Sequence, residues 1–338
     1  MPLDYFDSRV LTGVINKRPP QYSLFTQLFF SPASPQPTDK FELHIKSRGN
    51  NLLPFVREEE PGRVISGGSG EVVVLRAPRI RVKRRYKASE ILKNPLGYNP
   101  YQLVGDPVEQ AIVEDLDALR KDIDATTEWM CSKICTSGQF SVSDSIEGQS
   151  KVIYKLDNRM PSAHKITLSQ ANDKWDSANS KIMDNVEDWA TMIQDETGYA
   201  PTELVLGKNV WGKFFRHADV QDALDNRRID LGNLTPRVGN MFKGMWNGLR
   251  VWLYTGSVTG YDGKPEYLLN PNSIVLGAKD DESTIEYGLP LDRKCAGATQ
   301  FFTKTYEEED PSATWVLTES RPMPWAKRPG CFVCAKVL

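Results

Sequence analysis

The cysteines are the residues of this sequence whose spacing could do chemistry. Cys331 and Cys334 form a C-x-x-C pair, and three residues separate Cys131 from Cys135, while Cys295 stands apart. Four thiolates in two close pairs could close a tetrahedral zinc site. However, the first pair falls in an expected strand, whose side chains alternate between opposite faces, and the second falls inside a long expected helix. We therefore expect small buried hydrophobic residues and no metal site, with a cysteine-based metalloprotein as a less favoured alternative.

Catalytic motifs are missing from the chain. It contains no Walker A loop, no G-x-G-x-x-G, no G-x-S-x-G and no H-E-x-x-H. The three histidines, His44, His164 and His217, fall in an expected strand, a loop and a short helix, and nothing in the sequence pairs them with a base, a nucleophile or a metal. We expect no enzyme, no catalytic residue and no bound cofactor.

Length and composition are those of a soluble globular protein. The 338 residues exceed the size at which one core stops growing, which indicates two lobes or one lobe with long extensions. With 42 Lys and Arg against 44 Asp and Glu, the net charge is -2, which disfavours a generally cationic nucleic-acid binder. No apolar run is long enough to span a membrane, and the first nine residues lack a signal-peptide pattern. We expect reduced thiols and a protein that stays in a cytoplasm.

The first 45 residues carry an aromatic cluster but too little periodic pattern for a core of their own. Proline-rich stretches at 17–20 and 31–37 predict extended backbone on both sides of this cluster. Such a segment must lie on another surface, either the body of its own chain or a neighbouring subunit. We interpret residues 1–45 as an arm whose apolar side chains contact a neighbouring subunit, namely Phe25, Leu28, Phe29 and Phe30.

From Phe41 to Lys87 the pattern is that of strands, with apolar runs such as FELHI, LLPFV and EVVVL separated by turn residues. Long strands without a covering helix predict a projecting hairpin of about 50 Å, at roughly 3.3 Å per residue. A hairpin of this kind has little core of its own and needs a partner to lie on.

Seven cations lie within the twelve residues from Arg76 to Lys87. Nucleic-acid contact, a merely solvated face and pairing with an acidic patch of a neighbour, such as 58–60 or 307–310, are all open interpretations. Because the chain as a whole is not basic, we favour pairing between subunits over nucleic acid. The predicted contacts in and near the hairpin are Arg57, Glu58, Glu59, Arg79, Arg81, Lys83 and Arg84.

Asp106-Pro107-Val108-Glu109 has the N-cap, the early proline and the acidic residue typical of a helix start. Apolar or small residues recur every three or four positions as far as Ile134, and Ser137-Gly138 supplies a stop, so we predict a helix over 107–136. Its opposite face is polar and is either solvated or a contact surface; it carries Glu114, Asp117, Arg120, Lys121, Asp124 and Glu128.

The second half of the chain mixes helices and strands, which predicts an α+β lobe. A second helix is expected near 177–196 with Gly198 as its stop, and a short one near 209–217. Strands are expected at 202–206, 249–254, 267–269, 273–276 and 331–337.

Several motifs stand in one order along the chain: SLFTQLFF at 23–30, PGRVISGG at 61–68, GKNVWGKFF at 207–215, FKGMWNG at 242–248 and EEDPSATWVLTESRPMP at 308–324. With these motifs, the arm, the hairpin, the capped helix and the second lobe, the sequence resembles the lambda-type major capsid proteins of tailed double-stranded DNA bacteriophages. The resemblance implies the HK-97-like α+β fold. It also implies an N-terminal arm at 1–45, an extended loop at 46–84, a peripheral domain at 85–175 plus 308–338 with a spine helix at 107–136, and an axial domain at 176–307.

The same resemblance implies a major capsid protein that assembles with itself as pentamers and hexamers into an icosahedral shell around the phage genome. It implies assembly in the host bacterial cytoplasm and a final place in the virion. The implied partners are a scaffolding protein, a portal, a decoration protein at threefold sites and packaged double-stranded DNA bound without sequence specificity. No membrane is implied. An encapsulin-like nanocompartment shell is the alternative with the same fold.

Overall fold

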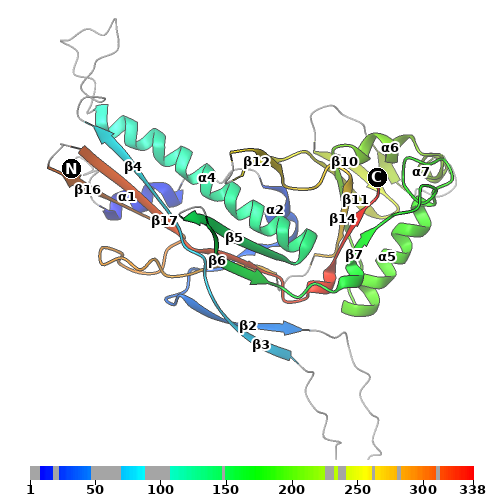
Figure 1. Ribbon diagram of the computed structural model, residues 1–338, viewed down its shortest axis with the longest axis horizontal. Coiled ribbons are helices and arrows are strands. Elements are labelled where there is room, and N and C mark those ends of the chain that lie inside the picture. Colours follow the sequence, from blue (N-terminus) through cyan, green and yellow to red (C-terminus); the bar gives the residue numbers. More distant parts are fainter. Residues whose placement is uncertain are drawn as a thin grey trace, which may run out of the picture.

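The protein was analysed as a computed structural model, which describes residues 8–17, 23–46, 70–87, 107–146, 149–224, 232–234, 241–260, 263–279, 283–309 and 313–338. Its longest described element is the helix α4 (Pro107–Ser137), which starts at the left end of the molecule and runs to the near side of the lobe on the right (Figure 1). The helix predicted at 107–136 is thus confirmed. It stops at Gly138, which adopts a left-handed φ of 68° and donates its N–H to the carbonyl of Ile134 at 3.0 Å. None of the helices in these ranges has the length and apolar character of a membrane span.

A seven-stranded mixed sheet forms the lobe at one end of α4, in the order β7-β19-β14-β8-β11-β10-β9. These strands are β7 (Lys165–Thr167), β8 (Glu203–Gly207), β9 (Gly232–Leu234), β10 (Phe242–Trp246), β11 (Leu249–Tyr254), β14 (Ser273–Gly277) and β19 (Phe332–Lys336). Helices α5 (Ile182–Thr197), α6 (Val210–Arg216) and α7 (Ala218–Leu224) belong to the same lobe (Figure 1). All residues of β8 and β14 are buried, as expected for central strands covered on both faces. The predicted α+β character is confirmed.

A three-stranded antiparallel sheet lies beside the other end of α4, in the order β16-β17-β4. It consists of β16 (Phe301–Glu308), β17 (Ala313–Ser320) and β4 (Ile80–Lys87). Together with α4 and the helix α1 (Ser8–Lys17), one face of this sheet encloses a separate small core that includes Leu11, Ile15, Ile112, Leu116 and Val316.

Sheet membership differs from the domain boundaries that the resemblance implied. The last strand, β19, pairs with β14 and β7 in the seven-stranded sheet, although residues 308–338 were assigned to the peripheral domain. Conversely, β16 pairs with β17 beside the spine helix, although residues up to 307 were assigned to the axial domain. The physical reason is that backbone hydrogen bonds, and not position along the chain, decide which strands share a sheet: β19 pairs with strands distant in sequence, whereas β16 pairs with the strand that follows it.

Among the described residues, three antiparallel hairpins lie outside these two sheets. They are formed by β2 (Lys40–Lys46) with β3 (Gly70–Arg76), by β5 (Gln139–Ile146) with β6 (Gln149–Asp157), and by β12 (Ser257–Thr259) with β13 (Pro265–Tyr267). The base of the predicted extended loop is therefore a hairpin, with Lys46 opposite Gly70. Residues 47–69, which include the predicted strand LLPFV, lie outside the described residues. A further small sheet joins β1 (Ser31–Pro32), β15 (Thr284–Tyr287) and β18 (Pro322–Trp325).

Candidate functional site

The described part of the arm contains two helices and lies on its own chain. Besides α1, it contains the helix α2 (Leu24–Phe29), which packs against α4 and the seven-stranded sheet (Figure 1). The side chains of Phe25, Phe29 and Phe30 are buried, and Leu28 is partly buried against the same core. The prediction that this cluster contacts a neighbouring subunit is therefore corrected for the three aromatic residues: of the two surfaces left open by the sequence, their own body covers them.

Ring contacts hold the arm on the sheet. The ring of Phe25 meets that of Tyr254 edge-on at 5.3 Å between centroids, and the ring of Phe29 meets that of Phe332 edge-on at 5.1 Å. Full burial of each such side chain stabilises the fold by about 1.5–3 kcal/mol. The arm helix is thus fixed to strands β11 and β19, which come from distant parts of the sequence.

Glu128 of the spine helix fixes the start of α2. Its carboxylate accepts the backbone N–H groups of Phe25 at 2.8 Å and Thr26 at 2.9 Å, and the hydroxyl of Thr26 at 2.7 Å. Ser23, at the N-cap position, makes no capping bond with its own side chain. Because an anion is stabilising at the positive end of a helix, Glu128 replaces the missing N-cap from another element.

Arg120 of the spine helix caps the C-terminal end of α1. Its guanidinium donates a hydrogen bond of 2.6 Å to the carbonyl of Ile15, one of the last residues of that helix, and stacks on the ring of Phe301 at 4.2 Å. A cation at the negative end of a helix is stabilising. Asp124, one turn further along α4, accepts a hydrogen bond from Arg120 at 3.3 Å. One face of the spine helix therefore carries the charges that match the facing ends of both arm helices.

The sequence placed Arg120 and Glu128 on the polar face of the helix, as part of a solvated or contact surface. Only 7% of Arg120 and 2% of Glu128 is exposed, so the contact interpretation is the correct one for both. The signal available in the sequence was the spacing of Arg120, Asp124 and Glu128 at successive intervals of four, which puts them in one line along the helix.

The predicted basic contacts on and before β4 have acidic partners in the same chain. Arg79 donates two hydrogen bonds, of 2.9 and 2.8 Å, to the carboxylate of Glu319 on β17, which is fully buried. Arg321 approaches the same carboxylate at 3.2 Å and Arg81 at 3.6 Å. Three guanidinium groups thus share one buried carboxylate at the root of the β2–β3 hairpin, an arrangement in which charge-assisted hydrogen bonds offset the cost of desolvation.

A second acidic partner is Asp292, whose carboxylate pairs with Lys304 and lies 3.5 Å from the guanidinium of Arg81. Burial, the largest single influence, raises the pKa of Asp292. The hydrogen bonds from Lys304 and from the backbone of Lys294, together with the two cations, outweigh it and bring the pKa below its usual value. Asp292 therefore stays ionised and holds β4 and β16 together.

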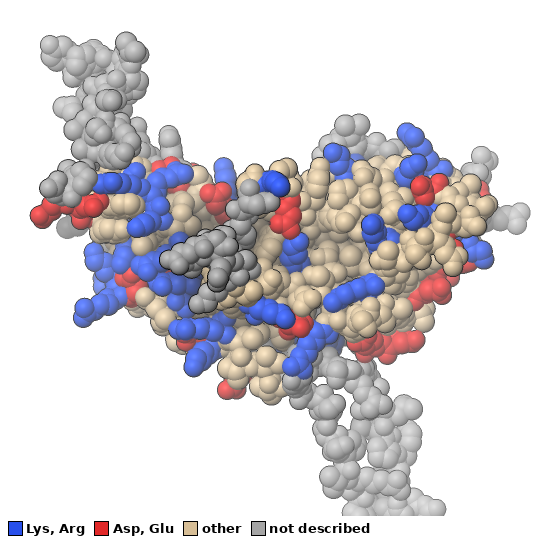
Figure 2. All heavy atoms as spheres, viewed as in Figure 1, with Lys and Arg blue, Asp and Glu red and all other residues tan. Residues whose placement is uncertain are grey.

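The basic residues at the outer end of β4 also have partners in their own chain. Arg84 pairs with Asp115 of the spine helix, and the hydroxyl of Tyr86 donates to the same carboxylate. The ammonium of Lys83 lies 4.7 Å from the ring centre of Trp315. Figure 2 shows Lys and Arg gathered over this end of the molecule, with acidic side chains among them. The remaining predicted contacts, Arg57, Glu58 and Glu59, lie outside the described residues.

Cys131 and Cys135 are buried in the spine helix, Cys331 is buried just before the last strand, and Cys334 is partly buried within that strand, whereas Cys295 stands apart. Burial raises the pKa of the Cys131 and Cys135 thiols well above the usual value and that of Cys334 to about 12. Protonated thiols of this kind pack as small hydrophobic groups. Within the described residues no group of three or more His, Cys, Asp or Glu side chains is arranged to hold a metal ion.

His164 and His217 both have structural partners. His164 is buried between Glu196, 2.9 Å from its Nε2, and the carbonyl of Phe332, 2.9 Å from its Nδ1. His217 contacts the hydroxyl of Ser180 at 3.0 Å. Each ties a loop to a neighbouring element.

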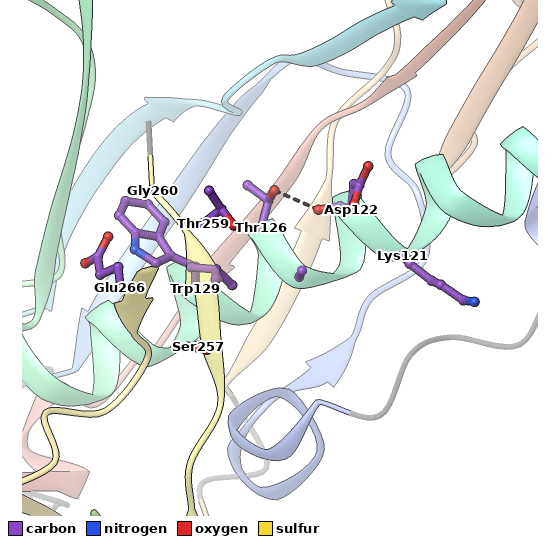
Figure 3. Close-up of a pocket in the computed structure, with 10 residues that line it drawn as sticks. Lys121, Asp122, Thr126, Trp129, Ser257, Thr259, Gly260 and Glu266 are labelled. Atoms are coloured by element: carbon purple, nitrogen blue, oxygen red, sulfur yellow. Dashed lines mark hydrogen bonds between the residues drawn. The ribbon is translucent and has the colours of Figure 1, made fainter. Parts of the chain in front are cut away.

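A groove of about 460 Å³ lies between the solvated face of α4 and the β12–β13 hairpin. Figure 3 shows Trp129 and Glu266 on one side of it, while Lys121 points away from both. Lys133 of α4 pairs with Glu266 at 2.6 Å, and Ser132 donates to the carbonyl of Leu268, so the hairpin is fastened to the helix.

Comparison with known proteins gives a consistent result. The family model described as Phage major capsid protein E matches residues 7–337. The major capsid protein of Enterobacteria phage P21 and the P21 prophage-derived major head protein of Escherichia coli O6:H1 strain CFT073 are each 21% identical over 345 residues, which cover 98% of this chain and 99% of the relative. The crystal structure of a prophage capsid protein from E. coli CFT073 has a TM-score of 0.70 at 19% identity, over 98% of this chain and 99% of that one, which is a likeness of fold.

Proposed function

Since this chain belongs to the phage major capsid protein E family, we propose that its copies assemble as pentamers and hexamers into the icosahedral shell that encloses the double-stranded DNA genome of a tailed phage. The chain is a structural component of the phage capsid, and so of the virion, and not an enzyme. Its fold is HK-97-like. The observation that carries the proposal is the match of family and fold over nearly the whole chain.

The contacts between copies are proposed at the projecting hairpins rather than at the arm aromatics. The strands of β2–β3 and of β5–β6 pair only with each other among the described residues, and two-stranded hairpins are marginally stable alone. Each also presents bulky apolar side chains to solvent: Val72 is 50% exposed, Val74 59%, Val152 56% and Ile153 63%. Side chains of this kind indicate surfaces that a neighbour covers.

The basic strand is a second proposed contact. Arg79, Arg81 and Arg84 keep 36% to 45% of their side chains exposed even though each has an acidic partner in its own chain. The ammonium of Lys83 lies over the ring of Trp315. We propose that acidic groups of a neighbouring copy use this remaining capacity, and that Arg57, Glu58 and Glu59 take part in the same contacts.

We assign the axial and peripheral domains by the sheet to which each strand belongs. The seven-stranded sheet with α5–α7 is proposed as the axial domain, whose copies meet around the fivefold and sixfold axes. The β16-β17-β4 sheet with the spine helix is proposed as the peripheral domain. These assignments keep the two lobes that the resemblance implied and move β16 and β19 between them.

Further partners are proposed from the resemblance. They are a scaffolding protein, a portal, a decoration protein at threefold sites and the packaged DNA, with assembly in the host cytoplasm. The net charge of -2 supports DNA contact without sequence specificity, because a strongly cationic lining would hold phosphates and impede packaging and ejection.

Cryo-electron microscopy of the purified full-length chain tests the proposal. Closed shells with fivefold and sixfold clusters are the expected result, and nucleic acid recovered from shells made during infection would separate a virion from a cellular nanocompartment. A protein that stays in small soluble oligomers at every concentration, with or without a scaffolding protein, would contradict the proposal. The metalloprotein alternative has no support among the described residues, where no group of three or more His, Cys, Asp or Glu side chains is arranged to hold a metal ion.

A further inference from the structure

Glu128 lies where three parts of the chain meet: the arm, the spine helix and the seven-stranded lobe. One carboxylate oxygen, Oε1, accepts the N–H of Phe25 at 2.8 Å and the hydroxyl of Tyr254 at 2.9 Å. The other, Oε2, accepts the N–H and the hydroxyl of Thr26. Tyr254 ends strand β11 and belongs to the lobe, whereas Phe25 and Thr26 belong to α2.

The four donors depend on one another through this carboxylate. A buried carboxylate is costly unless hydrogen bonds replace its hydration, and here four donors occupy the roughly four acceptor positions of its two oxygens. None of these donors carries a charge, so no single one neutralises Glu128. Loss of the Tyr254 hydroxyl therefore leaves the Glu128 carboxylate less well stabilised for its hydrogen bonds to the arm. Loss of the donors from Phe25 and Thr26 likewise weakens the hydrogen bond between Glu128 and Tyr254.

The arm helix has little other means of staying formed. It contains six residues, and helices of that length are unstable in water without tertiary contacts. The side chain of its N-cap residue, Ser23, makes no capping hydrogen bond to the helix. The helix α2 therefore depends on the cap that Glu128 provides, because it would not be stable without that cap.

We propose that Glu128 is a positioning residue that couples the seating of the arm helix α2 to the orientation of the axial lobe on the spine helix. The proposal deepens the shell function and rests on it only for its consequence: a tilt of the lobe during assembly that withdraws Tyr254 from Glu128 would loosen the arm. By the same linkage, an unseated arm would leave the lobe free to tilt.

Hydrogen exchange of the full-length chain, read by mass spectrometry, tests the coupling. In Glu128→Gln the side-chain NH₂ replaces one oxygen and faces two donors, so exchange in residues 24–29 should become at least about tenfold faster, as expected for losing charge-assisted bonds. In Tyr254→Phe, which leaves the arm and the spine helix unchanged, exchange in the same residues should become about threefold to tenfold faster. Asp122→Asn, an exposed acid of the same helix, should leave it unchanged.

Reciprocity gives a second measurement that does not require Glu128 to be altered. Thr26→Val keeps the shape of the arm residue and removes its hydroxyl, and exchange in residues 249–256 of the lobe should rise. Unchanged exchange of α2 in Tyr254→Phe, or unchanged exchange of the lobe in Thr26→Val, would overturn the coupling even if Glu128→Gln loosens the arm. Electron microscopy of the same samples keeps the two ideas apart, since wild-type protein that forms no shells counts against the shell function while its exchange still reports on Glu128.

Discussion

The ring of Phe29 fills the space beside Gly277 that any larger residue would need. A Cβ built at position 277 would lie 2.5 Å from one ring carbon of Phe29 and 2.6 Å from the next. Gly277 ends the buried central strand β14, and Phe29 ends the arm helix, so this contact joins the arm to the centre of the seven-stranded sheet.

Gly277→Ala should therefore destabilise the protein by about 1–3 kcal/mol, because the strand is buried on both faces and the ring has to leave its place. The measurement is the midpoint of denaturant unfolding. Gly212→Ala is the matched control: nothing lies within 4 Å of a Cβ there, and the residue sits inside α6, where alanine is favoured over glycine. Equal stability of the two variants would contradict the seating of the arm described here.

Glu319→Gln should cost more than the loss of its half-exposed cationic partner Arg79. The substitution leaves three guanidinium groups around an uncharged side chain, and breaking such a buried network typically costs about 3–5 kcal/mol. Arg79→Ala removes a residue with 39% of its side chain exposed, so its cost should be about 1 kcal/mol. Denaturant unfolding of both variants decides the matter, with Arg76→Ala as an exposed-pair control; a larger loss in Arg79→Ala would place the network elsewhere.

The elements that could be predicted from sequence are those whose causes are local. Pro107 and Gly138 bracket the spine helix, Gly198 ends α5, and the apolar run at 273–276 forms β14. Each depends on a dihedral preference or a periodicity within a few residues. The resemblance added the order of the parts and the fold.

The surface on which the arm packs could not be predicted from local sequence patterns. Its aromatic residues predict burial, but an apolar side chain carries no information on whether its own chain or another one covers it. The partners that decide, Tyr254 and Phe332, lie more than 200 positions away in sequence. For the same reason Glu128 was assigned to a polar face: its partners Phe25 and Thr26 lie more than 100 positions before it in the sequence.

The pair of His164 and Glu196 should make stability depend on pH. Burial, the largest influence, lowers the pKa of His164, but the hydrogen bond and charge of Glu196 and the bond to the Phe332 carbonyl outweigh it, so the pKa lies above 6.5 in the folded protein. The contribution is therefore fully present below the unfolded value and is lost as pH rises from about 6.5 through the folded pKa. Unfolding at about pH 5.5 and about pH 8.5 should show this loss, and His164→Gln should reduce it; an unchanged pH profile in that variant would count against the pair.

The five cysteines should differ in reactivity. Cys295 is partly exposed, whereas Cys131, Cys135 and Cys331 are buried and burial raises the pKa of Cys334 to about 12. Since the thiolate is the reactive form, a thiol-specific chromogenic reagent should modify Cys295 first in the native protein and all five only after unfolding. Cys295→Ser should remove the fast phase, and a fast phase that persists in this variant would show that the spine-helix junction opens.

Charge placed on the exposed valines should separate folding from assembly. Val72 and Val74 project from β3 on the side opposite to Val73 and Leu75, which pack on the core, so Val72→Asp with Val74→Asp should leave the subunit folded at a cost of about 1 kcal/mol or less each. If a neighbouring copy covers them, two buried carboxylates without partners at every contact should abolish shell formation. Sedimentation and electron microscopy measure the shells, and circular dichroism measures the fold.

The conservative pair Val72→Thr and Val74→Thr should assemble with reduced stability, and Leu291→Asp, an exposed apolar residue outside the hairpins, should assemble normally. Shells of wild-type yield and heat resistance from the double aspartate variant would show that this face of the hairpin stays in solvent, and the contact between copies would then have to lie on β5–β6 or on the basic strand.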